Sequence, residues 1–322
     1  MPGARNPSPD KRGRPAVWKE KIRILYGCIL HPLHSHRWLR FLRTHPVLRE
    51  VVKSPIALLR KIHQPWLSTR LDCSERVDLL IGHYNALFHA GFAPLLRQAA
   101  QKPLTLCTFF GKTGTPYALQ LSAMEQDRQD GELLLRLVSG STVIYAIACV
   151  IIRSEGGTSL KAGGLHGMLS TGRGTGIKQI TRDLYGCRPK DLMVLLARDL
   201  GRCFGCSSTV LTGNDNRLPD TAMRVCRKSA DWNRTWKELR ATPREDGDYE
   251  LPCPAVEDAL ERARCTSSPR NLLTPTRRSV LIEVIHAAMR ANIMARRVTT
   301  GYMSAAAARS IAGAETLERS HT

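Results

Sequence analysis

The chain contains no apolar run long enough to cross a membrane as a helix. The longest run, residues 143 to 152, has about the length of a strand, whereas a spanning helix needs roughly 20 apolar residues. The basic N-terminus also lacks an apolar core followed by a small-residue cleavage site, so we expect no signal peptide. These absences exclude a protein with membrane-spanning helices and predict a cytoplasmic location.

A second pair of metal ligands at standard spacing is also missing. Ten cysteines are present, and only Cys203 and Cys206 lie close together, at the end of a predicted helix. A zinc site would need a second pair, and a redox site would need a thioredoxin-like context. Because Cys107 and Cys149 fall within apolar strand patterns, we expect free buried thiols and no bound metal.

Acidic residues are scarce in the first 70 positions. This segment holds 15 Lys or Arg against 3 acids and therefore carries +12 of the net charge of +20. Aromatic residues are interleaved with the cations: Trp18, Tyr26, Trp38, Phe41 and Trp66. That combination suits an anionic membrane surface or a nucleic-acid backbone, and a disordered tail with solvated helix faces is the alternative. Nucleic acid is not the expected partner, because no helix-turn-helix, zinc-finger or RNP-type signature is present.

The remaining chain, with 43% hydrophobic residues overall, can bury a proper core. Four segments are expected: a disordered basic tail at 1–16, a helical region at 17–100, an α+β core at 101–265, and a helical or disordered tail at 266–322. Prolines break the start of the helical region into short helices. Asp72 or Ser74 then caps a longer helix whose apolar residues follow a 3.6-residue period.

From residue 104 the apolar period changes to that of strands, and the connections become short. Short connections force antiparallel neighbours, so the pattern predicts a meander sheet. Strands are expected at 104–110, 117–123, 132–138, 143–152 and 160–169, followed by helices at 176–185 and 189–204 and a strand at 209–211. The fold class is therefore α+β, an antiparallel meander with flanking helices. This order of elements resembles the acetyltransferase-like (GNAT) architecture.

Residues 180 to 190, I-T-R-D-L-Y-G-C-R-P-K, join the two predicted helices. Ile180 and Leu184 fall on one helical face, Gly186 lies where a left-handed C-cap is wanted, and Pro189 can open the next helix. The sequence therefore predicts a tight, specific joint.

This joint resembles the strongest marker of the VirK/YbjX family of bacterial proteins, a T-K-x-L-x-G-x-R-P-K-like run. The matching residues are Thr181, Leu184, Gly186, Arg188, Pro189 and Lys190, with Arg182 in place of the usual lysine. Further matches, in the expected order, are His83-Tyr84, Gly131-Glu132-Leu133, Gly164-Leu165-His166-Gly167, the box at 231–239 and the run at 249–252. Two departures are His166, where the family has glutamine, and Arg240-Ala241, where it has a glycine pair. The resemblance covers roughly residues 40 to 265.

The resemblance implies an intracellular bacterial factor linked with virulence, envelope integrity and tolerance of cationic antimicrobial peptides. It names no reaction, so two hypotheses stay open. In the first, the chain is an accessory protein that acts at the inner face of the envelope through residues 1–70. In the second, it is an acyltransferase that uses acyl-coenzyme A or acyl carrier protein. Splayed strands at the glycine-rich loop would favour the enzyme, and a filled core there would favour the accessory factor.

The glycine-rich run T-G-R-G-T-G-I at 171–177 lies between a predicted strand and a predicted helix. Glycines there allow backbone N–H groups to point at an anion beside the helix N-terminus. The run resembles part of the acetyltransferase coenzyme A loop. Arg173, Gly174, Gly176 and Lys178 are therefore candidates for holding coenzyme A or the phosphopantetheine of acyl carrier protein, with an ordinary connection as the alternative.

His166 is the candidate catalytic acid–base, because an imidazole at the end of a strand can exchange a proton near neutral pH. Glu132 and Asp231 are the alternative catalytic carboxylates. Each of the three has a structural interpretation too, as a hydrogen-bonded histidine or as an ion-pair partner of nearby arginines. Arg188 and Lys190 can bind an anion or cap exposed carbonyls.

Trp232 and Trp236, spaced by four residues, also carry two interpretations. They can pack on the core, or form an aromatic wall beside an acyl-chain groove.

Overall fold

The computed structural model describes residues 14–52, 54–125, 129–154, 157–167, 175–218, 231–253 and 277–298. Residues 1–13 of the expected disordered tail at 1–16, together with Arg173 and Gly174 of the glycine-rich run, lie outside these ranges, whereas residues 14–16 belong to the first helix. Within the described chain, no helix is both long and apolar enough to span a bilayer.

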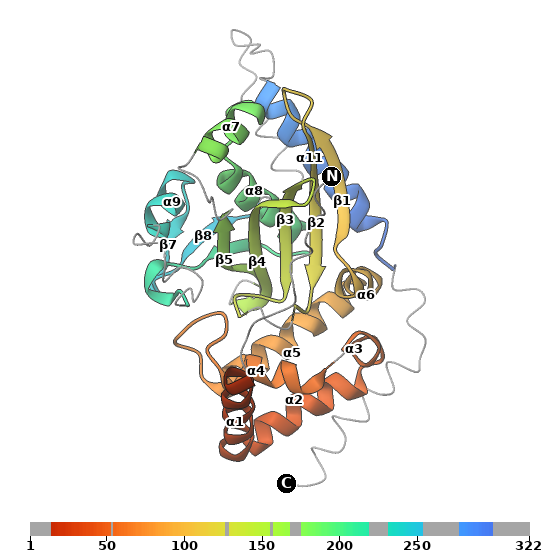
Figure 1. Cartoon of the computed structure of the whole chain (residues 1–322), viewed down its shortest axis with the longest axis vertical. Coiled ribbons are helices and arrows are strands. Elements are labelled where there is room, and N and C mark those ends of the chain that lie inside the picture. The colour runs from red at the N-terminus through yellow and green to blue at the C-terminus, as the bar shows by residue number, and fades with distance from the viewer. Residues whose placement is uncertain are drawn as a thin grey trace, which may run out of the picture.

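Six helices form one end of the molecule, at the bottom of Figure 1. They are α1 (Arg14–Leu30), α2 (Pro32–Thr44), α3 (Pro46–Val51), α4 (Pro55–His63), α5 (Cys73–His89) and α6 (Ala93–Gln101). Proline stands at the first position of α2, α3 and α4. A backbone N–H at that position has no partner within the helix, so its absence in proline costs no hydrogen bond. Asp72 starts α5 with a capping box, because its carboxylate accepts from the Glu75 N–H and the Glu75 carboxylate accepts from the Asp72 N–H.

The other end is an eight-stranded sheet in the order β1-β2-β3-β4-β5-β6-β8-β7. The strands are β1 (Leu104–Phe110), β2 (Pro116–Ala123), β3 (Leu133–Ser139), β4 (Thr142–Ser154), β5 (Gly157–Gly167), β6 (Ser208–Leu211), β7 (Thr242–Pro243) and β8 (Tyr249–Pro252). Strands β1 to β5 form the expected antiparallel meander, and only β5 and β6 pair in parallel. The predicted α+β class is confirmed, with β4 as an inner strand apolar on both faces.

The parallel pair requires a crossover, which α7 (Thr175–Asp183) and α8 (Pro189–Cys203) supply. Helix α8 packs on β4 and β5, and α11 (Arg277–Met294) packs on β1 and α8. Ile285, Met289 and Ile293 are the residues that α11 buries, at a spacing of four. A short helix, α9 (Trp232–Glu238), lies beside β7 and β8, at the edge of the sheet (Figure 1). One continuous apolar core joins both ends, since it includes Trp38 and Tyr84 from the helices and Ile147 from the sheet.

The joint between α7 and α8 has two consecutive left-handed residues. Gly186 has φ +81°, which confirms the predicted left-handed position, and Tyr185 has φ +53°. The Gly186 N–H donates to the Thr181 carbonyl at 2.8 Å, the bond that closes a Schellman end. Leu184 and Cys187 are fully buried on either side, so the joint is fixed to the core.

Substitution of Gly186 should lower stability through backbone strain alone. A Cβ at Gly186 would meet nothing within 4 Å, so Gly186→Ala should cost about 1 kcal/mol from the left-handed φ. Gly82, within α5, also has open space but no left-handed φ, so Gly82→Ala should instead add about 0.5–1 kcal/mol. Urea denaturation of both variants measures the difference. If the two substitutions changed the free energy of unfolding by the same amount and in the same direction, the left-handed backbone at Gly186 would not be the cause of the loss.

Candidate functional site

A depression of about 500 Å³ lies where α7, the start of α8 and β4 meet. We call it the basic pocket; it is lined by Tyr145, Ile177, Lys178, Thr181, Arg182, Arg188, Pro189 and Lys190. Lys178 and Arg182 are four residues apart and so share one face of α7. The tight joint at Gly186 then turns the chain so that Arg188 and Lys190 reach the same depression.

Cations outnumber carboxylates around the basic pocket. The Glu238 carboxylate on α9 lies 3.2 Å from Arg188 and 3.6 Å from Lys190, and Asp191 lies 3.9 Å from Lys190. The neighbouring charge of Lys190 lowers the pKa of Glu238, so this carboxylate is ionised at neutral pH. Lys178 and Arg182 have no acidic partner among the described residues, which leaves an excess of positive charge.

Tyr145 connects the basic pocket to the sheet. Burial, and then the nearby Asp191 carboxylate, raise the pKa of its phenol, so the ring stays neutral. A Cβ on Gly167, its partner on β5, would lie 3.0 Å from the ring. Glycine at that position therefore leaves room for the Tyr145 ring.

The end of α7 is held on the sheet by Asp183. Its carboxylate accepts from the Thr113 N–H and hydroxyl and from the Tyr117 hydroxyl, each at 2.7 Å. Burial would raise the pKa of Asp183, but these hydrogen bonds outweigh it and lower the pKa. A Cβ on Gly111 would lie 2.1 Å from this carboxylate, so glycine is required for the close approach. This anchor positions one wall of the basic pocket.

His166 lies on β5, as predicted, and its Nε2 contacts the Asp130 carboxylate. The imidazole is 32% exposed and the aspartate side chain 12%, so the pair is reachable from solvent. A carboxylate that orients a histidine is a common arrangement for a general base. Sequence reasoning missed Asp130, which belongs to the β2–β3 connection. Its carboxylate can approach β5 because Gly164 has no side chain: a Cβ there would lie 2.2 Å from the carboxylate.

His166 and the basic pocket lie on opposite faces of the sheet. Gly167 pairs with Tyr145, which lines the basic pocket, whereas His166 pairs with Ala146. Because neighbouring strand residues point to opposite faces, His166 is directed away from Lys178. The predicted acid–base and the described part of the predicted cofactor-binding run are therefore not brought together. Gly176 and Lys178 both lie in α7, and Lys178 lines the basic pocket.

Glu132 is buried inside the protein. Its carboxylate accepts from Lys61 Nζ at 2.6 Å and from the Tyr84 hydroxyl, and both charged side chains are 1% exposed. The Glu132 backbone also pairs with Cys149 on β4. These contacts tie α4 and α5 to the sheet, and they leave no path for a substrate to reach the carboxylate.

Asp231 and the two tryptophans form the start of α9. The Asp231 carboxylate accepts from Asn214 Nδ2 and from the Arg234 N–H, and these bonds lower its pKa. Trp232 and Trp236 stack with ring centroids 5.3 Å apart, and both are buried. The core-packing interpretation of the pair is therefore confirmed, and Asp231 acts as a helix cap.

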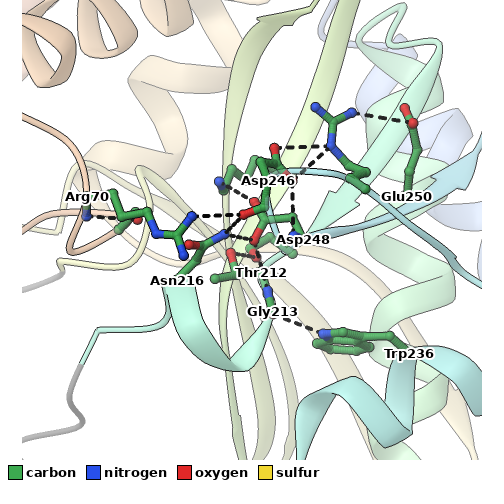
Figure 2. A network of polar contacts seen from close by, with 12 residues as sticks. Arg70, Thr212, Gly213, Asn216, Trp236, Asp246, Asp248 and Glu250 are labelled. Carbon is green, nitrogen blue, oxygen red and sulfur yellow. Dashed lines mark hydrogen bonds and ion pairs between the residues drawn. The ribbon is translucent and has the colours of Figure 1, made fainter.

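A buried polar network joins β5 to the β6–β8 edge, and its centre was not predicted from the sequence (Figure 2). Asp248 Oδ2 lies 2.6 Å from Lys161 Nζ, while Oδ1 accepts from the Gly213 N–H and from Asn216 Nδ2. Arg70 reaches in from the helical end to the Asp246 carbonyl. The Asp248 side chain is 1% exposed, so its contacts fix the edge of the sheet.

Beyond this network, β5 extends past its parallel partner. The β5–β6 pairing covers only residues 159 to 162, and β5 continues to Gly167. On the face of the sheet at Gly163 the packing is tight, since a Cβ there would lie 2.0 Å from the Asp130 carbonyl and 2.7 Å from Leu67. The glycine-rich loop, where splayed strands or a filled core would separate the two hypotheses, lies largely outside the described residues.

Cys203 and Cys206 are separate free thiols. Burial raises the pKa of each to about 12, which disfavours the thiolate that metals bind. Within the described residues, no group of three or more His, Cys, Asp or Glu side chains could hold a metal ion.

Helix α1 exposes a stripe of large apolar side chains. We call it the α1 stripe; its members, between 54% and 80% exposed, are Ile22, Leu25, Tyr26, Ile29, Leu30 and, just past the helix, Leu33. The opposite side of α1 packs on α4, where a Cβ on Gly27 would lie 2.4 Å from the His63 ring. Contiguous exposed apolar side chains of this kind are typical of protein–protein or membrane interaction sites.

Comparison with known proteins agrees with the motifs. A family model described as "Protein of unknown function (DUF535)" matches residues 15–270. A protein of Escherichia coli strain K12, described as "Uncharacterized protein YbjX", is 22% identical over 236 residues, which is 71% of each chain.

Two solved structures share a more distant likeness, both mutants of a cAMP-binding acyltransferase from Mycobacterium smegmatis. They are 14% and 15% identical to this chain, with TM-scores of 0.30 and 0.29. The match covers 63% of this chain and 60% of theirs, and at these TM-scores it establishes no common fold. The family assignment therefore rests on the family model and the E. coli relative, and by both the chain belongs to the VirK/YbjX family, DUF535.

Proposed function

We propose that this chain is an accessory protein that attaches peripherally to an anionic membrane surface, at the inner face of the bacterial envelope, through the α1 stripe. The links with virulence and antimicrobial-peptide tolerance that the family resemblance implies would be exerted from that surface. The observation that carries the proposal is the exposure of six large apolar side chains in one stripe. Water-exposed apolar area of this size favours transfer to an apolar medium.

The helix geometry separates the stripe from the buried side of α1. Residues 22, 25, 26, 29 and 30 follow the spacing of a single helical face, while Ile24 on the other side is 8% exposed. Lys21 and Arg23 fall at the two borders of the stripe, by the same 3.6-residue period. An apolar face bordered by cations is the pattern of helices that lie in the headgroup region of a membrane.

The charge around the stripe suits anionic lipid. The sequence has no acidic residue between Lys21 and Arg49. Arg37, Arg40 and Arg43 on α2 are exposed, and among the described residues only Arg37 of these three has an acidic partner, Asp78 at 2.6 Å. Each cation near an anionic surface adds about 1 kcal/mol of attraction, so attachment should weaken as salt is raised.

Membrane attachment is better tested by point substitutions than by deletion of residues 1–70. The deletion would remove Trp38, Lys61 and Trp66, which are buried, and so would damage folding. The variant Leu25→Ser with Ile29→Ser should lose at least about ten-fold in partitioning to vesicles of phosphatidylcholine and phosphatidylglycerol, since two anchoring side chains are removed. The matched control is Val280→Ser with Val284→Ser, two exposed apolar residues on α11.

Sedimentation with vesicles at low salt measures both variants against the native chain. Native binding that only the α1 variant loses supports the proposal. No binding by the native chain, or equal loss in the two variants, would contradict it.

A second candidate function is acyl transfer from acyl-coenzyme A or acyl carrier protein. One observation favours it: Lys178, a predicted cofactor-binding residue, lines a pocket with excess positive charge. Against it, His166 faces away from that pocket. Calorimetry with coenzyme A and acyl carrier protein, on the native chain and on Gly176→Val, tests it; absence of binding by the native chain removes this candidate.

A further inference from the structure

Membrane attachment through the α1 stripe does not use the basic pocket. Four cations line its wall, and two of them, Lys178 and Arg182, have no acidic partner among the described residues. Like charges gathered without full compensation repel one another, so a bound anion would relieve this repulsion.

We propose that the basic pocket binds the phosphate group of a small, soluble phosphorylated compound, a phosphomonoester or a diphosphate. Arginine and lysine together suit phosphate, because the guanidinium donates two parallel hydrogen bonds and the ammonium supplies a point charge. Ile177, Pro189 and the neutral ring of Tyr145 provide an apolar floor for the organic part. The volume of about 500 Å³ lies within the range of small-molecule sites.

The position of the pocket selects a soluble ligand over a lipid headgroup. Helix α1 and helix α7 lie at opposite ends of the long axis of the molecule (Figure 1). If the α1 stripe rests on a membrane, the basic pocket is held away from that surface. The assignment to a soluble ligand rests on the proposed membrane attachment through the α1 stripe, whereas the assignment of an anion-binding site does not.

The test uses the full chain without vesicles, so its outcome is independent of membrane attachment. Isothermal calorimetry at low salt measures binding of two probes: inorganic pyrophosphate, and dihexanoyl phosphatidic acid below its micellar concentration. The pocket variant is Lys178→Gln with Arg182→Gln, because these exposed side chains make no ion pair that folding needs. The matched control, Arg49→Gln with Lys102→Gln, removes the same charge from exposed positions in α3 and after α6.

The native chain should bind pyrophosphate, and the pocket variant should bind it at least about ten-fold more weakly, while the control should stay within about two-fold of native. Equal weakening in the pocket variant and the control would show a general charge effect and overturn the proposal. No binding of pyrophosphate by the native chain would overturn it as well. Pocket-dependent binding of the short-chain lipid alone would overturn the assignment to a soluble ligand.

Discussion

Replacement of Lys61 by methionine should lower the free energy of unfolding by about 3–5 kcal/mol. The side chain is 1% exposed and lies 2.6 Å from Glu132, so its loss leaves a carboxylate buried without a cation. Methionine fills a similar volume, which keeps a cavity from contributing to the loss. The Tyr84 hydroxyl still donates to Glu132, but one neutral donor does not replace the ammonium.

Urea denaturation of Lys61→Met measures this loss, and an exposed ion pair supplies the control. Arg97 lies 2.9 Å from Glu50 with both side chains nearly half exposed, so Arg97→Met should cost at most about 1 kcal/mol. If Lys61→Met lowered the free energy of unfolding by no more than Arg97→Met does, the structural role of the Lys61–Glu132 pair would be contradicted.

Asp248→Ala should also lower the free energy of unfolding, by about 3 kcal/mol or more. Three donors converge on this carboxylate: the Lys161 ammonium, the Gly213 N–H and the Asn216 amide (Figure 2). All three would be left without their acceptor in a buried place, where each unsatisfied donor costs about 1–3 kcal/mol.

The neighbouring Asp246 provides the matched control for Asp248. Its side chain is 48% exposed and pairs with Arg244, while the contacts that Arg70 and Asn216 make here are to its backbone carbonyl. Asp246→Ala should therefore cost about 1 kcal/mol or less. Thermal or urea denaturation compares the two, and similar losses would mean that burial of the network does not matter.

The local elements of the fold were predictable because their signals lie within a few residues. The strand at 104–110 and the helix start at Pro189 coincide with β1 and α8, since alternation and a proline at the first helical turn are local patterns. The order of β1 to β5 followed from the short connections alone.

The polar centres were not predictable in the same way, because their partners are distant in the sequence. Lys61 and Glu132 are 71 residues apart, and Lys161 and Asp248 are 87 apart. No spacing rule connects such pairs, so the burial of Glu132 against Lys61 could not be predicted from the sequence.

The candidate site was predicted in part. The sequence singled out Lys178 in the glycine-rich run and, separately, Arg188 and Lys190 beside the joint, but it did not predict that they share a pocket with Arg182. Tyr145, which completes the basic pocket, comes from β4 and carries no local signal. Successive residues along a strand point to opposite faces of the sheet, and this alternation separates His166 from the basic pocket.

Hydrogen exchange of the full chain, with and without phosphatidylglycerol-containing vesicles, tests the central claim most directly. Attachment through the α1 stripe predicts slower exchange at residues 21–34, because insertion suppresses opening of α1, and no change at residues 177–190 at the opposite end of the molecule. Unchanged exchange at 21–34, or protection confined to 177–190, would contradict it.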